Sequence, residues 1–209
     1  MNKILFIDIL STGMSPDNCG IYRIGGIYTE DGVEKKVIDL KMCPPINARI
    51  SQQSLWIGGE SRSSLISYPD EKRVFARFCE WLDTIVSVRK ADDKLYLAGY
   101  NSAAFDMPFL REYFNRCGSN DFRNYFHVQC IDIMSISAMA LMNERGRMQD
   151  FMMDSVAAHL GIHTFPGDKY DCISNARTAL DIYRHFIRRF GIDEVKDTSR
   201  ADDIVKNYE

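Results

Sequence analysis

The sequence predicts an α/β domain built on a mixed β-sheet, and three observations lead to this fold class. Three apolar runs of strand length open the chain, and Asp31-Gly32 between the last two suits a tight hairpin turn. Helical and strand patterns then alternate as far as the last strong helix. Antiparallel strands followed by alternating helices and strands are typical of a mixed sheet flanked by helices.

The first strands are expected at residues 3–9, 21–29 and 33–42, where branched and aromatic residues predominate. Residues 43–70 are instead interrupted by prolines and glycines, namely Pro44, Pro45, Gly58, Gly59 and Pro69. Such residues punctuate regular structure, so we expect a long irregular segment at the surface.

The middle of the chain alternates between helix and strand. Apolar residues at helical spacing predict a helix over 74–86, and residues 94–100 indicate a buried strand. The next helix has Pro108 near its start and Gly118 past its end, as helix boundaries often do. A further strand is expected at 125–133, followed by a helix rich in Met and Ala.

Two helices are expected in the last part of the domain. Asp154 is predicted to cap a short helix that Gly161 stops. The last helix starts at about Ser174 and carries one apolar stripe. Residues 1–192 are therefore expected to form one domain, and residues 193–209 a polar tail.

Composition narrows the class of protein. The chain has 209 residues, of which 45% are hydrophobic, enough to bury the core of a single domain. Its net charge of −3 gives no global attraction to polyanions or membrane surfaces, so any nucleic-acid site must be local. Six scattered cysteines without a CxxC pair suit buried thiols in a reducing compartment. The N-terminus is unlike a signal peptide and no run is long enough to span a membrane, so we expect a cytoplasmic protein.

The stretch FIDILSTG, residues 6–13, combines a strand with a turn. Asp8 and Leu10 lie two residues apart, so they share one face of the strand. Sites in α/β sheets gather at the carboxyl ends of strands, which is where Asp8 and Asn101 are expected.

Three motifs together resemble those of DEDD-type (DnaQ-like) 3'-to-5' exonucleases. They are FIDILSTG, then GYNSAAFDMPFL at 99–110, then YDCISNARTALDIYRHF at 170–186, and the resemblance covers residues 1 to about 190. It implies a ribonuclease H-like fold and phosphodiester hydrolysis by two divalent cations held on clustered acids. Mg²⁺ or Mn²⁺ suits such oxygen ligands.

The first two motifs match the family to different degrees. Motif one is Asp-x-Glu followed by Thr-Thr-Gly, and here Asp8 is present while Leu10 replaces the glutamate. Motif two is intact, with Asn101, Phe105 and Asp106 in place.

Motif three departs further from the family pattern of His, four residues, then Asp. Aligned on the start of the last helix, this chain has Tyr170 and Asn175. A branch of the family uses Tyr four residues before its Asp, whereas Tyr170 precedes Asn175 by five, and a free phenol is a poor base at neutral pH. A rival register pairs His163 with Asp168, although no helix follows it.

The candidate site residues follow from these motifs. Asp8 and Asp106 are the expected metal ligands, while Tyr170 and Asn175 occupy the remaining catalytic positions. Asp171 is a further possible carboxylate, and Asp132 is interpreted as structural. With so few acids we expect weak binding of Mg²⁺ or Mn²⁺, at one site at most.

The resemblance also implies a binding surface for the 3'-terminal nucleotide. It is formed by the turn after motif one together with motif two, that is, by Ser11, Thr12, Gly13, Met14, Asn101 and Phe105. Four arginines of the last helix are either phosphate contacts or a solvated face: Arg177, Arg184, Arg188 and Arg189.

Two functions remain open. The first is a non-catalytic descendant that binds single-stranded nucleic-acid 3' ends, or a protein partner. The second is an active metal-dependent 3'-to-5' exonuclease on single-stranded DNA or RNA. Three altered motif residues of different chemical types favour the first. The choice between DNA and RNA, the partners and the oligomeric state stay open.

Overall fold

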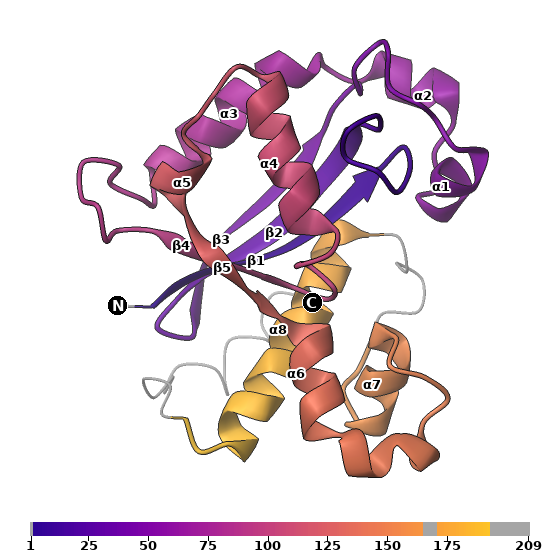
Figure 1. Cartoon of the computed structure of the whole chain (residues 1–209), viewed down its shortest axis with the longest axis vertical. Helices are drawn as coiled ribbons and strands as arrows, with labels where there is room; N and C mark the ends of the chain where they lie inside the picture. The colour runs from indigo at the N-terminus through magenta and orange to yellow at the C-terminus, as the bar shows by residue number, and fades with distance from the viewer. Residues whose placement is uncertain (1, 165–170, 193–209) are drawn as a thin grey trace, which may run out of the picture.

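The computed structural model describes residues 2–164 and 171–192, and its centre is a five-stranded sheet in the order β3-β2-β1-β4-β5 (Figure 1). The strands are β1 Lys3–Ser11, β2 Ile21–Glu30, β3 Val33–Lys41, β4 Leu95–Gly99 and β5 Phe126–Asp132. β1, β2 and β3 pair antiparallel, whereas β4 is parallel to β1 and β5 is parallel to β4. The predicted mixed sheet with antiparallel first strands is confirmed.

The hairpin between β2 and β3 turns at the residues that the sequence indicated. Asp31 and Gly32 both have positive φ, 48° and 80°. Two successive residues in this region match the type I′ turn, which suits the twist of the flanking strands. β3 is the first strand in the order of the sheet and so forms one of its edges. The side chains of Lys35, Lys36 and Lys41 on this strand are exposed.

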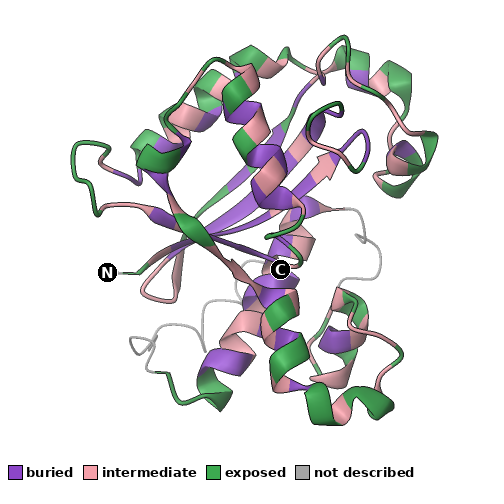
Figure 2. Cartoon of the chain, viewed as in Figure 1, coloured by how far each residue is buried: buried purple, intermediate pink, exposed green. Residues whose placement is uncertain are grey.

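Helices cover both faces of the sheet (Figure 1). One face is covered by α3 Glu71–Asp83, α4 Asp106–Arg116 and α5 Phe122–Tyr125, and the other by α6 Ile133–Ala140, α7 Met153–His159 and α8 Cys172–Arg189, with the 3₁₀ helix η1 Met142–Arg147 after α6. Alternate β1 side chains enter the two cores: Leu5 packs with α3 and α4, while Phe6 packs with α8. Figure 2 shows the central strands buried along most of their length.

Two short helices occupy the segment that was expected to be irregular, so that prediction was wrong for α1 Gln52–Ile57 and α2 Arg62–Ser67. Each has a serine N-cap, Ser51 or Ser61, whose side chain accepts a hydrogen bond from the backbone of the first turn. Leu55 and Leu65 anchor them against Tyr22 of β2. Helices of six residues with one buried leucine each leave no periodic signal in the sequence.

The predicted cap of α7 is also corrected. α7 begins at Met153 with Met152 at the N-cap position, so Asp154 lies within the first turn, where its charge suits the helix dipole. The predicted helix stops Gly118 and Gly161 both have positive φ, 76° and 68°.

α8 starts at Cys172, two residues before the predicted start, because Asp171 caps it. The Asp171 side chain accepts a hydrogen bond of 2.9 Å from the backbone N–H of Ser174. The helix begins directly on the sheet: a β-carbon added to Gly25 of β2 would lie 2.8 Å from the carbonyl carbon of Cys172. A glycine in β2 thus lets the first turn of α8 approach β1.

No helix within residues 2–164 and 171–192 combines the length and the apolar character needed to cross a membrane.

Candidate active site

The structure brings Asp8 and Asp106 to the same place at the carboxyl end of the sheet. Asp106 is the first residue of α4 and is only 4% exposed. Its Oδ1 accepts a hydrogen bond of 2.9 Å from the backbone N–H of Ile9, the neighbour of Asp8 in β1. Asp106 therefore does not cap α4 through its side chain, the alternative role that the sequence allows. One motif acid, Asp8, is therefore part of β1, and the other, Asp106, is hydrogen-bonded to the next residue of the same strand.

Asn175 completes the group from α8. Its side-chain amide donates a hydrogen bond of 3.2 Å to Oδ2 of Asp8. Cys172, also in the first turn of α8, is a buried thiol whose proximity lowers the pKa of Asp8. Asp8 thus faces a neutral amide and a neutral thiol of α8, where the motif of the resembling exonucleases would supply another acid.

Cys172 was not among the predicted site residues. Its position directly after the cap residue gave no functional signal, because the contact depends on how closely α8 approaches β2 at Gly25. All six cysteines are free, and Cys172 and Cys19 are the fully buried ones.

Burial perturbs both acids. It raises the pKa of Asp8 to about 6, against the hydrogen bond from Asn175 and the proximity of Cys172, which both lower it. Burial also raises the pKa of Asp106 well above its ordinary value, and the nearby Asp8 charge raises it further. The two carboxylates therefore resist simultaneous ionisation unless a cation is present.

The surroundings of Leu10 are apolar. Leu10 packs against a small cluster of Tyr22, Leu55 and Leu65, which ties the end of β1 to α1 and α2. The Leu10 side chain has no atom that could coordinate a metal ion. It contributes instead to the apolar contact between β1 and these two helices.

The donors among the described residues do not fit a pair of divalent cations. These two carboxylates and one amide carry too little negative charge to hold two such ions against their mutual repulsion. Within the described part of the chain, no group of three His, Cys, Asp or Glu side chains could hold a metal ion.

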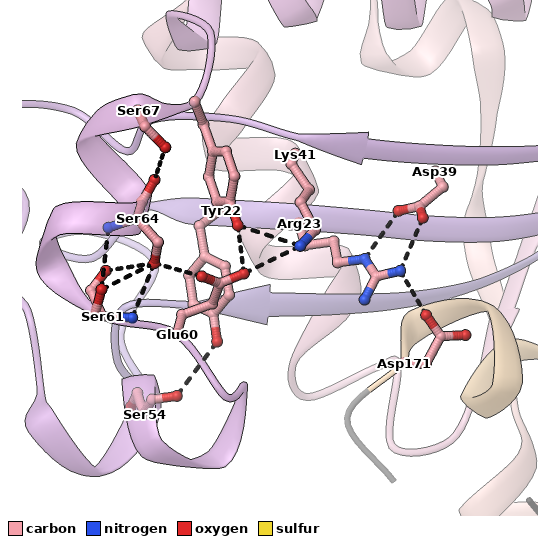
Figure 3. Close-up of polar contacts among 11 residues, drawn as sticks. Tyr22, Arg23, Asp39, Lys41, Ser54, Glu60, Ser61, Ser64, Ser67 and Asp171 are labelled. Atoms are coloured by element: carbon pink, nitrogen blue, oxygen red, sulfur yellow. Dashed lines mark hydrogen bonds and ion pairs between the residues drawn. The ribbon is translucent and has the colours of Figure 1, made fainter. Parts of the chain in front are cut away.

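Asp171, the possible substitute carboxylate, is engaged elsewhere (Figure 3). Arg23 of β2 pairs with Asp171 and also forms two hydrogen bonds, 2.9 and 2.8 Å, with Asp39 of β3. The Arg23 guanidinium thus fastens the start of α8 to the sheet. Asp171 acts as helix cap and ion-pair partner.

A second polar group holds α1 and α2 beside the strands (Figure 3). Glu60 accepts hydrogen bonds from Tyr68 Oη at 2.6 Å, from Lys41 Nζ at 3.2 Å and from the Ser64 hydroxyl. The Tyr22 hydroxyl donates to the carbonyl of Ser54 at 3.3 Å. These bonds fix α1 and α2 beside β2 and β3.

That turn contains the predicted nucleotide contacts Ser11–Met14. The hydroxyl of Ser11 donates to the carbonyl of Gly13 at 2.6 Å, and Thr12 is fully buried. A β-carbon at Gly13 would come within 2.6 Å of the Cys19 sulfur, so a larger residue there would have to displace the Cys19 side chain. Met14 is 80% exposed at the tip of the turn.

Asn101 and Phe105 lie beyond the end of β4. Asn101 has a positive φ of 65°, a conformation that asparagine tolerates well, and its carbonyl accepts from the N–H of Phe105 at 3.1 Å. Asp132 caps α6 and also accepts from the N–H of Ala103 at 2.9 Å, which agrees with its structural interpretation. The loop before α4 is thereby fixed close to Asp106.

Three of the four candidate phosphate-binding arginines of α8 are paired with acids. Arg177 and Arg184 both contact Glu34 of β3, and Arg189 contacts Glu144 of η1. Their charges are thus largely used within the protein.

Tyr170 and Asp168 lie outside the described residues. His163 of the rival register is exposed. The roles predicted for all three stay predictions.

Comparison of the sequence finds no matching family model and no matching curated protein. Solved structures do match: E. coli Exonuclease I in complex with a dT13 oligonucleotide gives a TM-score of 0.73 at 15% identity, covering 91% of this chain and 43% of that chain. The chain shares the fold of one part of Exonuclease I. The predicted ribonuclease H-like class is therefore confirmed.

Two further Exonuclease I structures agree. The zinc-bound form of an E. coli Exonuclease I complex with single-stranded DNA has a TM-score of 0.73 at 14% identity, covering 92% of this chain and 42% of the neighbour. An SSB/Exonuclease I structure with an inhibitor has a TM-score of 0.70 at 14% identity, covering 90% and 42%. The chain spans less than half the length of these Exonuclease I chains.

Proposed function

We propose that this protein binds the 3' end of single-stranded nucleic acid at the DEDD-type site and hydrolyses phosphodiester bonds weakly or not at all. One observation carries the proposal. Asp8 of β1 is hydrogen-bonded to the amide of Asn175, at the place where the exonuclease motif would supply a second carboxylate. The site keeps its position in the fold while its charge is reduced.

The loss of charge bears directly on the chemistry. Two-metal hydrolysis needs acids that hold both cations against the phosphate. Here Asp8 and Asp106 remain, while Leu10 is committed to apolar packing. We expect Mg²⁺ or Mn²⁺ to bind weakly, at one site at most. Tyr170, if it takes the base position, brings a phenol whose reference pKa near 10 makes it a poor base at neutral pH.

The binding surface supports the other half of the proposal. The turn Ser11–Met14 is held rigidly, and Asn101 and Phe105 lie on the loop that leads to Asp106. E. coli Exonuclease I, part of which has the same fold, forms complexes with the oligonucleotides dT13 and 5cy-dT13. We further infer that residues 1–192 form a single domain. The six free thiols suit a cytoplasmic location. A protein partner is a second kind of ligand that we propose for this surface.

Binding is tested with a 5'-labelled single-stranded oligonucleotide in EDTA, followed by fluorescence anisotropy. A linear competitor with a free 3'-OH should displace it at least tenfold better than a circular single strand of equal length. Equal competition would overturn the assignment to 3' ends. Absence of binding to both DNA and RNA would overturn the proposal as a whole.

Hydrolysis is tested with the same probe and Mn²⁺ on a denaturing gel. We expect the probe to stay intact. Shortening from the 3' end that disappears in both Asp8→Ala and Asp106→Ala would establish the active exonuclease instead. Shortening that persists in both variants would indicate a contaminating nuclease.

A further inference from the structure

The turn after β1 borders a hollow of about 260 Å³, which extends from the predicted contacts Thr12, Gly13 and Met14 to Arg49. It is lined by Thr12, Gly13, Met14, Ser15, Asn18, Cys19, Arg49 and Ser51. Met14 and Arg49 are its exposed members with long side chains. The hollow therefore combines an apolar side chain with a guanidinium.

Hydrogen bonds fix Arg49 to the turn although 37 residues separate it from Thr12. The Thr12 hydroxyl donates to the carbonyl of Arg49 at 2.7 Å, and the N–H of Arg49 donates to the carbonyl of Asn18 at 2.7 Å. The N–H of Ser51 donates to the carbonyl of Thr12 at 2.8 Å. The backbone of Arg49 is thus held in place before any ligand arrives.

The loop at residues 16–19, which also lines the hollow, is fixed as well. Nη1 of Arg116 in α4 donates to the carbonyls of Pro16 and Cys19, at 3.2 and 3.3 Å. Arg116 itself pairs with Glu71 of α3. The loop that carries Asn18 and Cys19 is therefore anchored to α4, so the backbone around the hollow is preorganised.

Arg49 differs from Arg23 and Arg177, two other arginines near the site, because both of these form ion pairs with carboxylates. Arg23 is bound by Asp39 and Asp171, and Arg177 is bound by Glu34. Across residues 2–164 and 171–192, no carboxylate forms an ion pair with Arg49. Its charge is available to an external anion.

We propose that this hollow binds a phosphate of the single strand next to its 3'-terminal nucleotide, with the Arg49 guanidinium on the phosphate and the Met14 side chain against the adjoining sugar or base. The inference rests on the proposed function. A guanidinium presents two N–H groups in the geometry that a phosphate accepts. A thioether makes adaptable apolar contact.

The test compares Arg49→Gln, Arg49→Lys and the wild type, with Arg77→Gln on the exposed face of α3 as the matched control. Anisotropy with a single-stranded oligonucleotide in EDTA is measured across a series of salt concentrations. Arg49→Gln should bind roughly tenfold more weakly, and the slope of log K against log salt should fall in magnitude by about 0.7, the loss of one phosphate contact. Arg49→Lys should keep the slope, and Arg77→Gln should match the wild type.

The outcomes separate this inference from the proposed function. An unchanged affinity and slope in Arg49→Gln, while the wild type binds 3' ends, overturns the phosphate contact alone. An equal loss in Arg77→Gln also overturns it, because the effect would then be one of general charge. A wild type that binds no oligonucleotide overturns both.

Discussion

The side-chain amide of Asn175 lies 3.2 Å from Oδ2 of Asp8 and donates a hydrogen bond to it, which joins the first turn of α8 to β1. In a two-metal site a carboxylate at this position would share cations with Asp8. Here an amide hydrogen-bonds the Asp8 oxygen instead. This contact is the first to test.

Asn175→Asp should raise the affinity for Mn²⁺ at least tenfold, because it adds a third carboxylate beside Asp8 and Asp106. Isothermal titration measures the change. Asn47→Asp, which adds the same charge at an exposed position, is the control and should leave the affinity unchanged. Equal affinities in Asn175→Asp and the wild type would show that charge is not what limits metal binding.

Asp8→Asn should stabilise the protein above pH 7. Burial raises the pKa of Asp8 to about 6 from an ordinary value of 3.8, so the folded state holds a proton that the unfolded state has released. Stability from this group is full below about pH 4 and is lost as the pH rises through 6. Urea unfolding should show a gain of up to about 3 kcal/mol at pH 7.5 that shrinks towards pH 4. A gain that is independent of pH would contradict this account.

Gly25→Ala should destabilise the fold by about 1–3 kcal/mol, because the new methyl group would collide with the start of α8. Gly146→Ala is the matched control, since a β-carbon there meets no atom within 4 Å. Thermal or urea unfolding compares the two variants. If both lose the same stability, the close approach of α8 to β2 is not as described.

Arg23→Ala should cost roughly 1–2 kcal/mol in urea unfolding, because it removes the partly buried partner of Asp39 and Asp171. Removing this positive charge should also raise the pKa of Asp8 further, since Arg23 lowers it. NMR titration of the Asp8 carboxyl reads the second effect directly. Arg77→Ala on α3 should change neither quantity.

Much of the fold could be predicted because its signals are local. Alternation and the Asp31-Gly32 pair located the first strands and their turn, and Gly118 and Gly161 marked helix ends through their positive φ. The α1 and α2 helices escaped prediction because they are held by contacts to Tyr22 and Glu60 rather than by their own periodicity.

The site was predictable only where a motif carried it. The matching motifs indicated that Asp8 and Asp106 lie close together. In the structure Asp106 is hydrogen-bonded to Ile9, the residue that follows Asp8 in β1. The contact of Arg23 with Asp171 spans 148 residues and belongs to no motif. Arg49 lies beside the turn after β1, and Cys172 lies beside Asp8, because of contacts between residues far apart in the sequence. No motif in the sequence indicates either contact.

The lysines of β3 bear on how copies of this protein meet. Lys35 and Lys36 stand exposed on the outermost strand, whose unpaired backbone would otherwise be a template for another chain. Like charges brought edge to edge repel, and desolvating them is costly. The exposed lysines therefore oppose pairing of this edge with a strand of another copy.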